Sequence, residues 1–334
     1  MKKRLFLLLV LLVLTVTPAP SQEVETISIL NGTVRRATSV RQKPSSRQRV
    51  ISRLAANATV RILSPDTRNG FWRVILDRGR QGYVPATDVE IPEAAIHAAR
   101  TSAASPPCAN ELRDCQPHGC AEPESKRGLF NKAKNHLPTG SRALTISFAD
   151  LKALQRQADE VVDQGTELTQ EQRDSLSGFR VTNGRAGEGK LVKLMGFIAE
   201  GLDPHANSGG ESVNCRLRTA ANNDFHISIA RLPSHSEFQG MVAEMIPHDR
   251  PAGWTIPKLK QVKQRRLLVM LVGGLFYDND HVVNADPTDN LRGEPKRFSL
   301  WEIHPITKFF VCKRAGNACS ASNSSHWTRL EDFQ

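Results

Sequence analysis

The chain has 334 residues, more than one ordinary hydrophobic core accommodates, so its length predicts two domains. Lys and Arg number 45 against 34 Asp and Glu, a net charge of +11 that favours anionic polymers over cationic partners. Because the charge is spread along the chain, a solvated basic surface is an equally good interpretation. The sequence contains no nucleophile elbow, Walker loop, His-Glu-x-x-His or Rossmann glycine pattern, which excludes enzymes that depend on those motifs.

Residues 1–21 are predicted to be a secretory signal peptide. Basic residues at positions 2–4 precede the apolar run Leu5–Val16, and the small residues Ala19 and Ser21 suit a cleavage site. The run is short for a bilayer span, although an uncleaved N-terminal anchor is the alternative. We therefore expect a periplasmic or secreted protein of the cell envelope, with no transmembrane segment after signal cleavage.

Six cysteines follow the predicted signal. An even count in an oxidising compartment predicts disulfide bonds, for which 15 pairings are possible. Equal six-residue gaps make two local loops one plausible arrangement, while zinc binding by the first three cysteines with His118 is a weaker alternative because the usual two-residue knuckle is missing. The predicted disulfide cysteines are Cys108, Cys115, Cys120, Cys215, Cys312 and Cys319.

Residues 25–91 read as a small all-β domain. Short alternating runs separated by Gly or Pro predict an antiparallel barrel or sandwich. The stretches Asn69-Gly70-Phe71-Trp72-Arg73-Val74 and Gly82-Tyr83-Val84 resemble the bacterial SH3-like domain of exported envelope proteins. That resemblance implies a barrel of five to seven strands that binds peptides or cell-wall fragments and performs no catalysis.

Three residues are candidates for the ligand groove of this SH3-like barrel: Trp72, Tyr83 and Arg73. Trp72 and Tyr83 each combine an apolar face with a polar tip, as a shallow groove requires, but packing in the core of so small a barrel is the alternative.

A connector follows. Residues 92–107 are rich in Ala, Ser and Pro and are predicted to be a linker, and residues 108–145 form a cysteine-rich, basic segment. Residues 146–180 are predicted to be helical, with one helix over Phe148–Asp163 capped by Ser147 and a second starting at the capping box of Thr169.

The C-terminal domain is predicted to span residues 188–314, with a tail over 315–334. Expected strands over 191–200, 212–218 and 224–230, helices over 237–246 and 257–264, and two final strands within 266–312 give an order that resembles the OB-fold in architecture. The predicted fold class is therefore mainly β, with two small barrels. Because OB-folds bind oligonucleotides, oligosaccharides or proteins, this fold class does not indicate one function.

Three pairs of carboxylate and imidazole residues occur at strand positions of this domain. A spacing of two places both members on one face of a strand, and a converged set would suit zinc or another divalent metal that activates water. Backbone hydrogen bonding and ordinary turn chemistry are the alternatives. The pairs are Asp224 with His226, Asp278 with His281, and Glu302 with His304.

We expect an exported, non-catalytic binding protein without a cofactor. Its SH3-like domain would bind peptidoglycan or a cell-wall peptide, and its OB-like domain would bind a second, anionic ligand through Tyr277, His281 and His226. The alternative functions are a metal-dependent hydrolase of the nuclease type, and an extracellular protein that binds nucleic acid.

Overall fold

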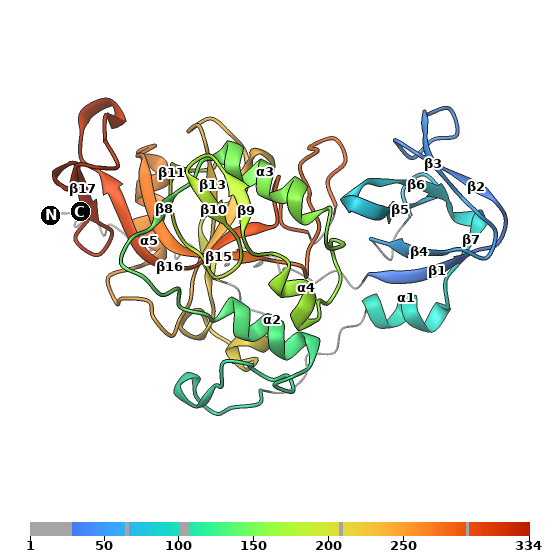
Figure 1. Ribbon diagram of the computed structural model, residues 1–334, viewed down its shortest axis with the longest axis horizontal. Coiled ribbons are helices and arrows are strands. Elements are labelled where there is room, and N and C mark those ends of the chain that lie inside the picture. The colour runs from blue at the N-terminus through green and yellow to red at the C-terminus, as the bar shows by residue number, and fades with distance from the viewer. Residues whose placement is uncertain (1–28, 64–66, 101–106, 207–209, 292–293) are drawn as a thin grey trace, which may run out of the picture.

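The computed structural model describes residues 29–63, 67–100, 107–206, 210–291 and 294–334. The predicted signal peptide lies outside these ranges. The described chain is mainly β and forms a seven-stranded sheet, an eight-stranded sheet and the two-stranded pair β9–β10, in two bodies that lie side by side (Figure 1). The expected fold class is confirmed.

The N-terminal body is a seven-stranded antiparallel sheet with strand order β3-β2-β6-β5-β4-β1-β7. Alternate residues along these strands, such as Val34, Val40 and Val74, meet in one buried apolar core, as their period of two predicts. Helix α1, Glu93–Arg100, follows the last strand. The strands are β1 Leu30–Val34, β2 Thr38–Arg41, β3 Val50–Leu54, β4 Thr59–Ile62, β5 Phe71–Ile75, β6 Gln81–Pro85 and β7 Val89–Glu90.

The second body contains a closed barrel of five strands. The strands pair in the order β11-β13-β14-β16-β15, and β15 pairs with β11 to close the barrel. All of these pairs are antiparallel except β14 with β16, which is parallel. Helix α5, Ile256–Gln264, connects the third and fourth strands, as expected. The strands are β11 Leu191–Ile198, β13 Phe225–Ala230, β14 Gly240–Met245, β15 Val269–Tyr277 and β16 Trp301–Cys312.

The third barrel strand is not where the sequence predicted it. The expected strand over 212–218 is a 3₁₀ turn at Ser212–Asn214 followed by irregular chain, and the expected helix over 237–246 is the strand β14. Every residue of β14 is buried, so the segment lacks the polar alternation that marks a half-buried strand. A short, continuously buried run is not distinguishable from a helix by periodicity.

The remaining elements surround the barrel. Ser147 and Thr169 cap helices α3 and α4, as predicted, and both do so through reciprocal capping boxes, although α3 ends at Ala158 rather than at Asp163. The helices are α2 Lys126–Lys134, α3 Phe148–Ala158 and α4 Gln170–Asp174; the strands are β8 Leu144–Thr145, β9 Phe179–Val181, β10 Gly184–Ala186, β12 His205–Ala206 and β17 Trp327–Arg329. Further 3₁₀ turns are Asp77–Gly79, Ala86–Asp88, Leu112–Asp114, Ala220–Asn222, Glu237–Gln239, Ala315–Asn317 and Ser324–His326.

All six cysteines form disulfides: Cys108–Cys120, Cys115–Cys215 and Cys312–Cys319. The local loop at Cys312 is confirmed. The arrangement with a matching loop between Cys108 and Cys115 is wrong, because Cys115 pairs with a residue 100 positions away that only the tertiary fold brings near. Among the described residues, no helix has the length and apolar character to cross a membrane.

The segment between β15 and β16 joins the two bodies. Val282 and Leu291 pack against Leu63 and Ile75 of the N-terminal sheet, forming a small apolar cluster at the boundary. Nearby, Arg61 donates a hydrogen bond to the backbone oxygen of Gln164, 3.0 Å away. The boundary is therefore formed by both apolar and polar contacts.

Candidate functional site

Three neighbouring barrel strands present charged side chains on their outward face. His226 of β13 lies directly opposite Glu244 of β14, and side chains at such paired positions share a face of the sheet. On β16, Glu302 and His304 are two residues apart and so also share a face. Between these positions the chain contributes to the main core through Ile227, Ala243 and Ile303. The charged side chains of these strands therefore point away from the barrel core.

His304 is held in one orientation by contacts to both of its ring nitrogens. Nδ1 lies 2.6 Å from the backbone oxygen of Lys134, a partner that can only accept, so Nδ1 carries a proton. Nε2 points at two carboxylates, 3.1 Å from Asp224 Oδ2 and 3.0 Å from Glu244 Oε2. In the neutral imidazole, Nε2 is therefore the nitrogen with a free lone pair.

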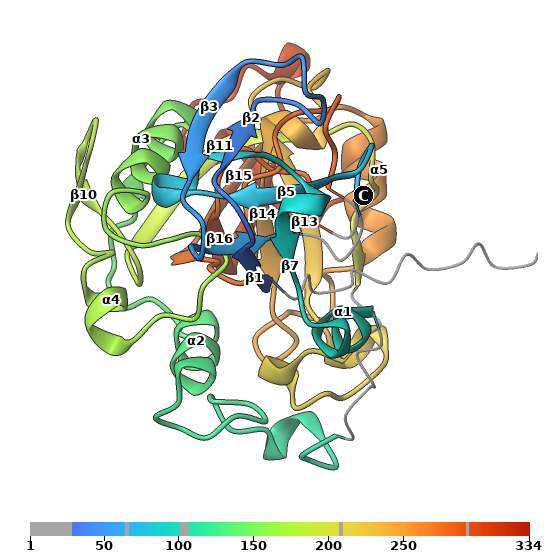
Figure 2. The same cartoon turned by 90° about the vertical axis from the view of Figure 1, so that its right-hand side faces the viewer.

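The ammonium group of Lys134, at the end of α2, enters the same cluster. Its Nζ lies 3.1 Å from Glu244 Oε2, 3.5 Å from Glu211 Oε2 and 3.8 Å from Asp224 Oδ2. Helix α2 lies below the barrel strands in both views of the molecule (Figures 1 and 2). One lysine is thus surrounded by three carboxylates in a buried location.

His226 lies at the outer side of the cluster. Its Nε2 is 2.9 Å from Glu244 Oε1, and 3.8 Å from an oxygen of Glu211. The ring stacks on His205 of the neighbouring strand β12, with centroids 5.5 Å apart. The side chains of His226 and Glu211 are 17% and 21% exposed, whereas those of Glu244 and His304 are buried, so solvent reaches the cluster from this side.

The other predicted residues gather in a second, adjoining cluster. His281 Nδ1 lies 2.5 Å from Asp278 Oδ2, at the end of β15. The buried guanidinium of Arg297 bridges the two carboxylates, 3.1 Å from Asp278 and 2.6 Å from Glu302. Glu294 accepts a hydrogen bond from the backbone of Val282 in the same segment.

Carboxylates outnumber permanent cations in the first cluster. With both imidazoles neutral, Asp224, Glu244 and Glu211 carry three negative charges against the single charge of Lys134. Burying uncompensated charge is costly, so the site demands two further positive charges. Protonation of His226 and His304 supplies them, and so would one divalent cation.

The pKa shifts follow from this excess. Burial alone would lower the pKa of each histidine, but the Glu244 carboxylate raises the pKa of His226 to about 9, and hydrogen bonds to Asp224 and Glu244 raise that of His304 to about 10. Burial opposes ionisation of Glu244, yet His226 and Lys134 hold its pKa well below its usual value.

The second cluster shows the same effects. Burial would lower the pKa of His281, but the neighbouring Asp278 carboxylate raises it to about 9. Burial, together with the Glu244 and Asp278 carboxylates, raises the pKa of Glu302 to about 8. The guanidinium of Arg297 opposes this rise, because it favours the ionised form of Glu302.

A divalent ion fits among three of these residues. One ligand atom each from Asp224, Glu244 and His304 lies within 4.8 Å of the others. Ligands roughly 2.0–2.2 Å from one tetrahedral ion stand about 3.3–3.6 Å apart, a few tenths of an ångström more than the contacts of His304 Nε2 with its two carboxylates. A backbone carbonyl on the remote nitrogen is also the usual support of a metal-binding histidine. Glu244 Oε2 is buried, with His304 Nε2 at 3.0 Å and Lys134 Nζ at 3.1 Å as its charged neighbours.

The six residues proposed from the sequence thus fall into two groups. Asp224, His226 and His304 lie in the first cluster, and Asp278, His281 and Glu302 lie in the second, with Arg297 between Asp278 and Glu302. The structure does not bring all six around one point.

Sequence reasoning missed three central members of the clusters. The sequence places Glu244 in an expected helix, Lys134 in the basic connector and Arg297 at the start of the last expected strand, and it indicates no contact among them. The available signal for Glu244 was its position as the one charged residue in the run from Gly240 to Ile246, since a charge inside an apolar strand is rare without a partner.

The groove candidates of the N-terminal body have other surroundings. Tyr83 is buried and donates a hydrogen bond to Asp289 of the second body, and Arg73 donates one to the Asp289 backbone oxygen at 2.6 Å. Trp72 is partly buried and packs against the core of its own sheet. Tyr277, a candidate of the second body, is fully buried with its ring edge-on to Trp301.

Comparisons with known proteins identify no family. No protein-family model matches the chain, and no curated protein shows significant similarity to it.

Proposed function

We propose that this protein is an exported, metal-dependent hydrolase whose divalent ion is held by Asp224, Glu244 and His304. The observation that supports it is the excess of buried carboxylate around His304, whose Nε2 faces two carboxylate oxygens at 3.0 and 3.1 Å. Carboxylate oxygen and imidazole nitrogen suit Zn²⁺ and related ions. A bound ion of this kind supplies a water molecule that ionises near neutral pH.

His226 is the residue best placed to move a proton. Its Nε2 contacts Glu244, a proposed ligand, and its side chain is partly exposed at the solvent side of the cluster. Three protein ligands leave a coordination position for water or substrate, the arrangement of catalytic rather than structural zinc sites. A divalent ion would replace the protons on the two imidazoles, so that His226 would be neutral and could accept a proton from a water molecule, while the Glu244 carboxylate would stabilise the charged ring.

A phosphodiester of an anionic polymer is the substrate class that we propose. Loss of Lys2, Lys3 and Arg4 with the predicted signal peptide changes the net charge from +11 to +8, which still raises the local concentration of anionic substrates outside the cell. Three disulfides are compatible with an extracytoplasmic location.

The test is hydrolysis of bis(p-nitrophenyl) phosphate and of single-stranded DNA by purified protein, first treated with EDTA and then supplied with Zn²⁺, Mn²⁺ or Mg²⁺. We expect activity only with added metal, and a loss of at least 100-fold in His304→Ala and Glu244→Gln. His136→Ala removes an exposed imidazole and serves as the control. Equal turnover with and without metal, or full activity of both ligand variants, would contradict the proposal.

A second candidate function is binding of an anionic ligand without catalysis, with the SH3-like body contacting peptidoglycan or a cell-wall peptide. One surface hollow of about 550 Å³ favours it, because its wall contains Arg265, Lys313 and Arg314 and no acidic residue. Co-sedimentation with insoluble peptidoglycan tests the first contact, and binding of a fluorescent oligonucleotide tests the second. Lys313→Glu together with Arg314→Glu should abolish oligonucleotide binding, and unchanged binding would remove this candidate.

A further inference from the structure

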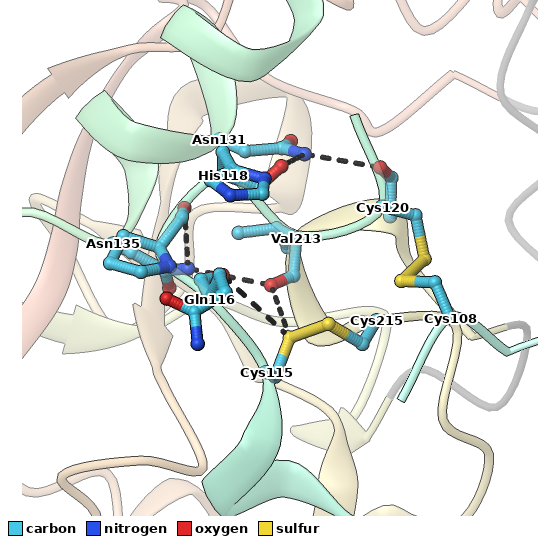
Figure 3. The surroundings of a disulfide bond; sticks show 11 residues. Cys108, Cys115, Gln116, His118, Cys120, Asn131, Asn135, Val213 and Cys215 are labelled. Atoms are coloured by element: carbon cyan, nitrogen blue, oxygen red, sulfur yellow. Dashed lines mark hydrogen bonds between the residues drawn. A yellow bond between two sulfur atoms is a disulfide. The ribbon is translucent and has the colours of Figure 1, made fainter. Parts of the chain in front are cut away.

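Two of the disulfides lie next to each other. The Cys108–Cys120 bond lies within the cysteine-rich connector, and the Cys115–Cys215 bond joins the connector to the segment that follows Glu211. Figure 3 shows the two bonds side by side. The sulfur atoms of Cys108, Cys120 and Cys215 all lie within 4.8 Å of one another. A thiolate formed on Cys108 or Cys120 would therefore stand near contact distance from the sulfur of a second disulfide.

The two bonds differ in access to solvent. Cys108 is exposed and Cys115 and Cys120 are partly exposed, whereas Cys215 is buried. A reductant in solution reaches the Cys108–Cys120 bond first. The buried sulfur of Cys215 lies next to that bond, so a thiolate formed there can attack it.

Hydrogen bonds, as well as disulfides, hold the cysteine-rich connector against the segment from Ser212 to Cys215. The backbone nitrogen of Cys120 donates to Ser212 at 3.0 Å, and that of Cys108 donates to Cys215 at 3.2 Å. Asn131 of α2 adds hydrogen bonds to the backbone of His118 and to the Ser212 hydroxyl. Because these contacts do not involve sulfur, the connector stays in place when its disulfide partner changes.

We propose that these four cysteines form a thiol–disulfide exchange site that accepts electrons from a dithiol. The dithiol reduces Cys108–Cys120 to two thiols and leaves as its own disulfide, a transfer of two electrons and two protons. The Cys120 thiol loses its proton to water, and the thiolate attacks Cys215 Sγ. The Cys120–Cys215 bond forms, the Cys115–Cys215 bond breaks, and Cys115 departs as a thiolate that takes up a proton. The inference does not depend on the proposed hydrolase activity.

A single substitution tests the exchange step without added reductant. Cys108→Ser leaves Cys120 as a free thiol beside the Cys115–Cys215 bond. Incubation at pH 6, 7 and 8, followed by acid quench, alkylation in denaturant and peptide mass spectrometry, reports which cysteine is free. We expect alkylation to divide between Cys120 and Cys115, with a rate that rises up to about tenfold per pH unit, as the thiolate fraction does below a thiol pKa near 8.5. Alkylation confined to Cys120 at every pH would overturn the proposal.

Two further proteins complete the test. Cys319→Ser frees Cys312, which does not belong to the three-sulfur group, and its alkylation should stay on Cys312. Appearance of free Cys115 in this control would show unspecific reshuffling and would also overturn the proposal. Should Cys108→Ser fail to fold, the unmodified protein treated with less than one equivalent of dithiothreitol should yield a cross-linked peptide pair containing Cys215 with Cys120 or Cys108. Its absence would count against the exchange site equally.

Discussion

The hydroxyl group of Tyr83 donates a hydrogen bond to the carboxylate of Asp289 across the boundary between the two bodies. Arg68 binds the same carboxylate at 2.5 Å, and Arg73 binds the Asp289 backbone oxygen. Two of the residues expected to form a ligand groove are thus engaged by the protein's own chain. A peptide or cell-wall fragment recognised by Tyr83 or Arg73 would have to displace Asp289.

Asp289→Ala should loosen the contact between the bodies. It removes a carboxylate that serves one tyrosine and two arginine side chains, so we expect a loss of about 1–3 kcal/mol in the free energy of unfolding. Urea denaturation followed by tryptophan fluorescence measures it. Asp77→Ala removes an exposed aspartate from the N-terminal body and should change stability by less than about 0.5 kcal/mol. Identical unfolding of the two variants would show that the Asp289 contact contributes nothing.

His281 should make stability depend on pH. Its pKa is about 9 in the folded protein against 6.5 for the ordinary side chain. A group whose pKa is higher in the folded than in the unfolded protein contributes its full stabilisation at pH values below the unfolded-state pKa. The contribution of His281 is therefore complete below about pH 6.5 and is lost as the pH rises through 9. His281→Gln should therefore cost up to about 3 kcal/mol at pH 6 and much less at pH 9.5.

Chemical denaturation at both pH values, beside His136→Gln as the control for an exposed imidazole, measures the difference. A destabilisation by His281→Gln that is the same at pH 6 and pH 9.5 would contradict a charged contact between His281 and Asp278.

Local periodicity and cap chemistry sufficed to predict much of the fold. Ser147 was recognised as a cap because Ser is a preferred N-cap residue, and Thr169 because it forms a capping box with Gln172, three residues later. The alternation of Phe225, Ile227 and Ile229 with polar residues marked β13 as a half-buried strand. Caps and strand alternation depend on residues that are close in the sequence, so the sequence alone is enough to predict them.

The site was only half predictable, since its contacts are long-range. His304 and Asp224 were selected because strand spacing placed each beside another polar residue, and they do meet. Lys134 reaches them from a helix 170 residues before His304, and no local pattern indicates that approach. Asp278 and Glu302 were expected at one ion, but Arg297 lies between them, because a guanidinium compensates two buried carboxylates.

The disulfides should contribute unequally to stability. In the chain-entropy account the stabilisation grows with the loop that is closed, and the separations are 100 residues for Cys115–Cys215 and 7 for Cys312–Cys319. Replacing both cysteines of a pair by Ser should cost about 5 kcal/mol for the first pair and about 2 kcal/mol for the second. Guanidinium denaturation of the two double variants measures the costs. Equal losses would mean that native packing around the bonds, rather than loop closure, sets their contributions.

Lys134→Met should convert the first cluster into a stronger metal site. The variant removes the ammonium from among three carboxylates, and breaking a buried ionic network in this way costs about 3–5 kcal/mol without metal. A divalent ion no longer competes with Lys134, so Zn²⁺ or Mn²⁺ should raise the melting temperature of the variant more than that of the unmodified protein.

Lys132→Met is the matched control for the Lys134 variant. Lys132 lies on the same helix and pairs with Glu124 at the surface, so its loss should cost at most about 1 kcal/mol and leave the metal response unchanged. Thermal unfolding after EDTA treatment, repeated across a series of metal concentrations, compares the three proteins. If the ion raises all three melting temperatures equally, it binds away from Lys134, and the ligand set Asp224, Glu244 and His304 would have to be abandoned.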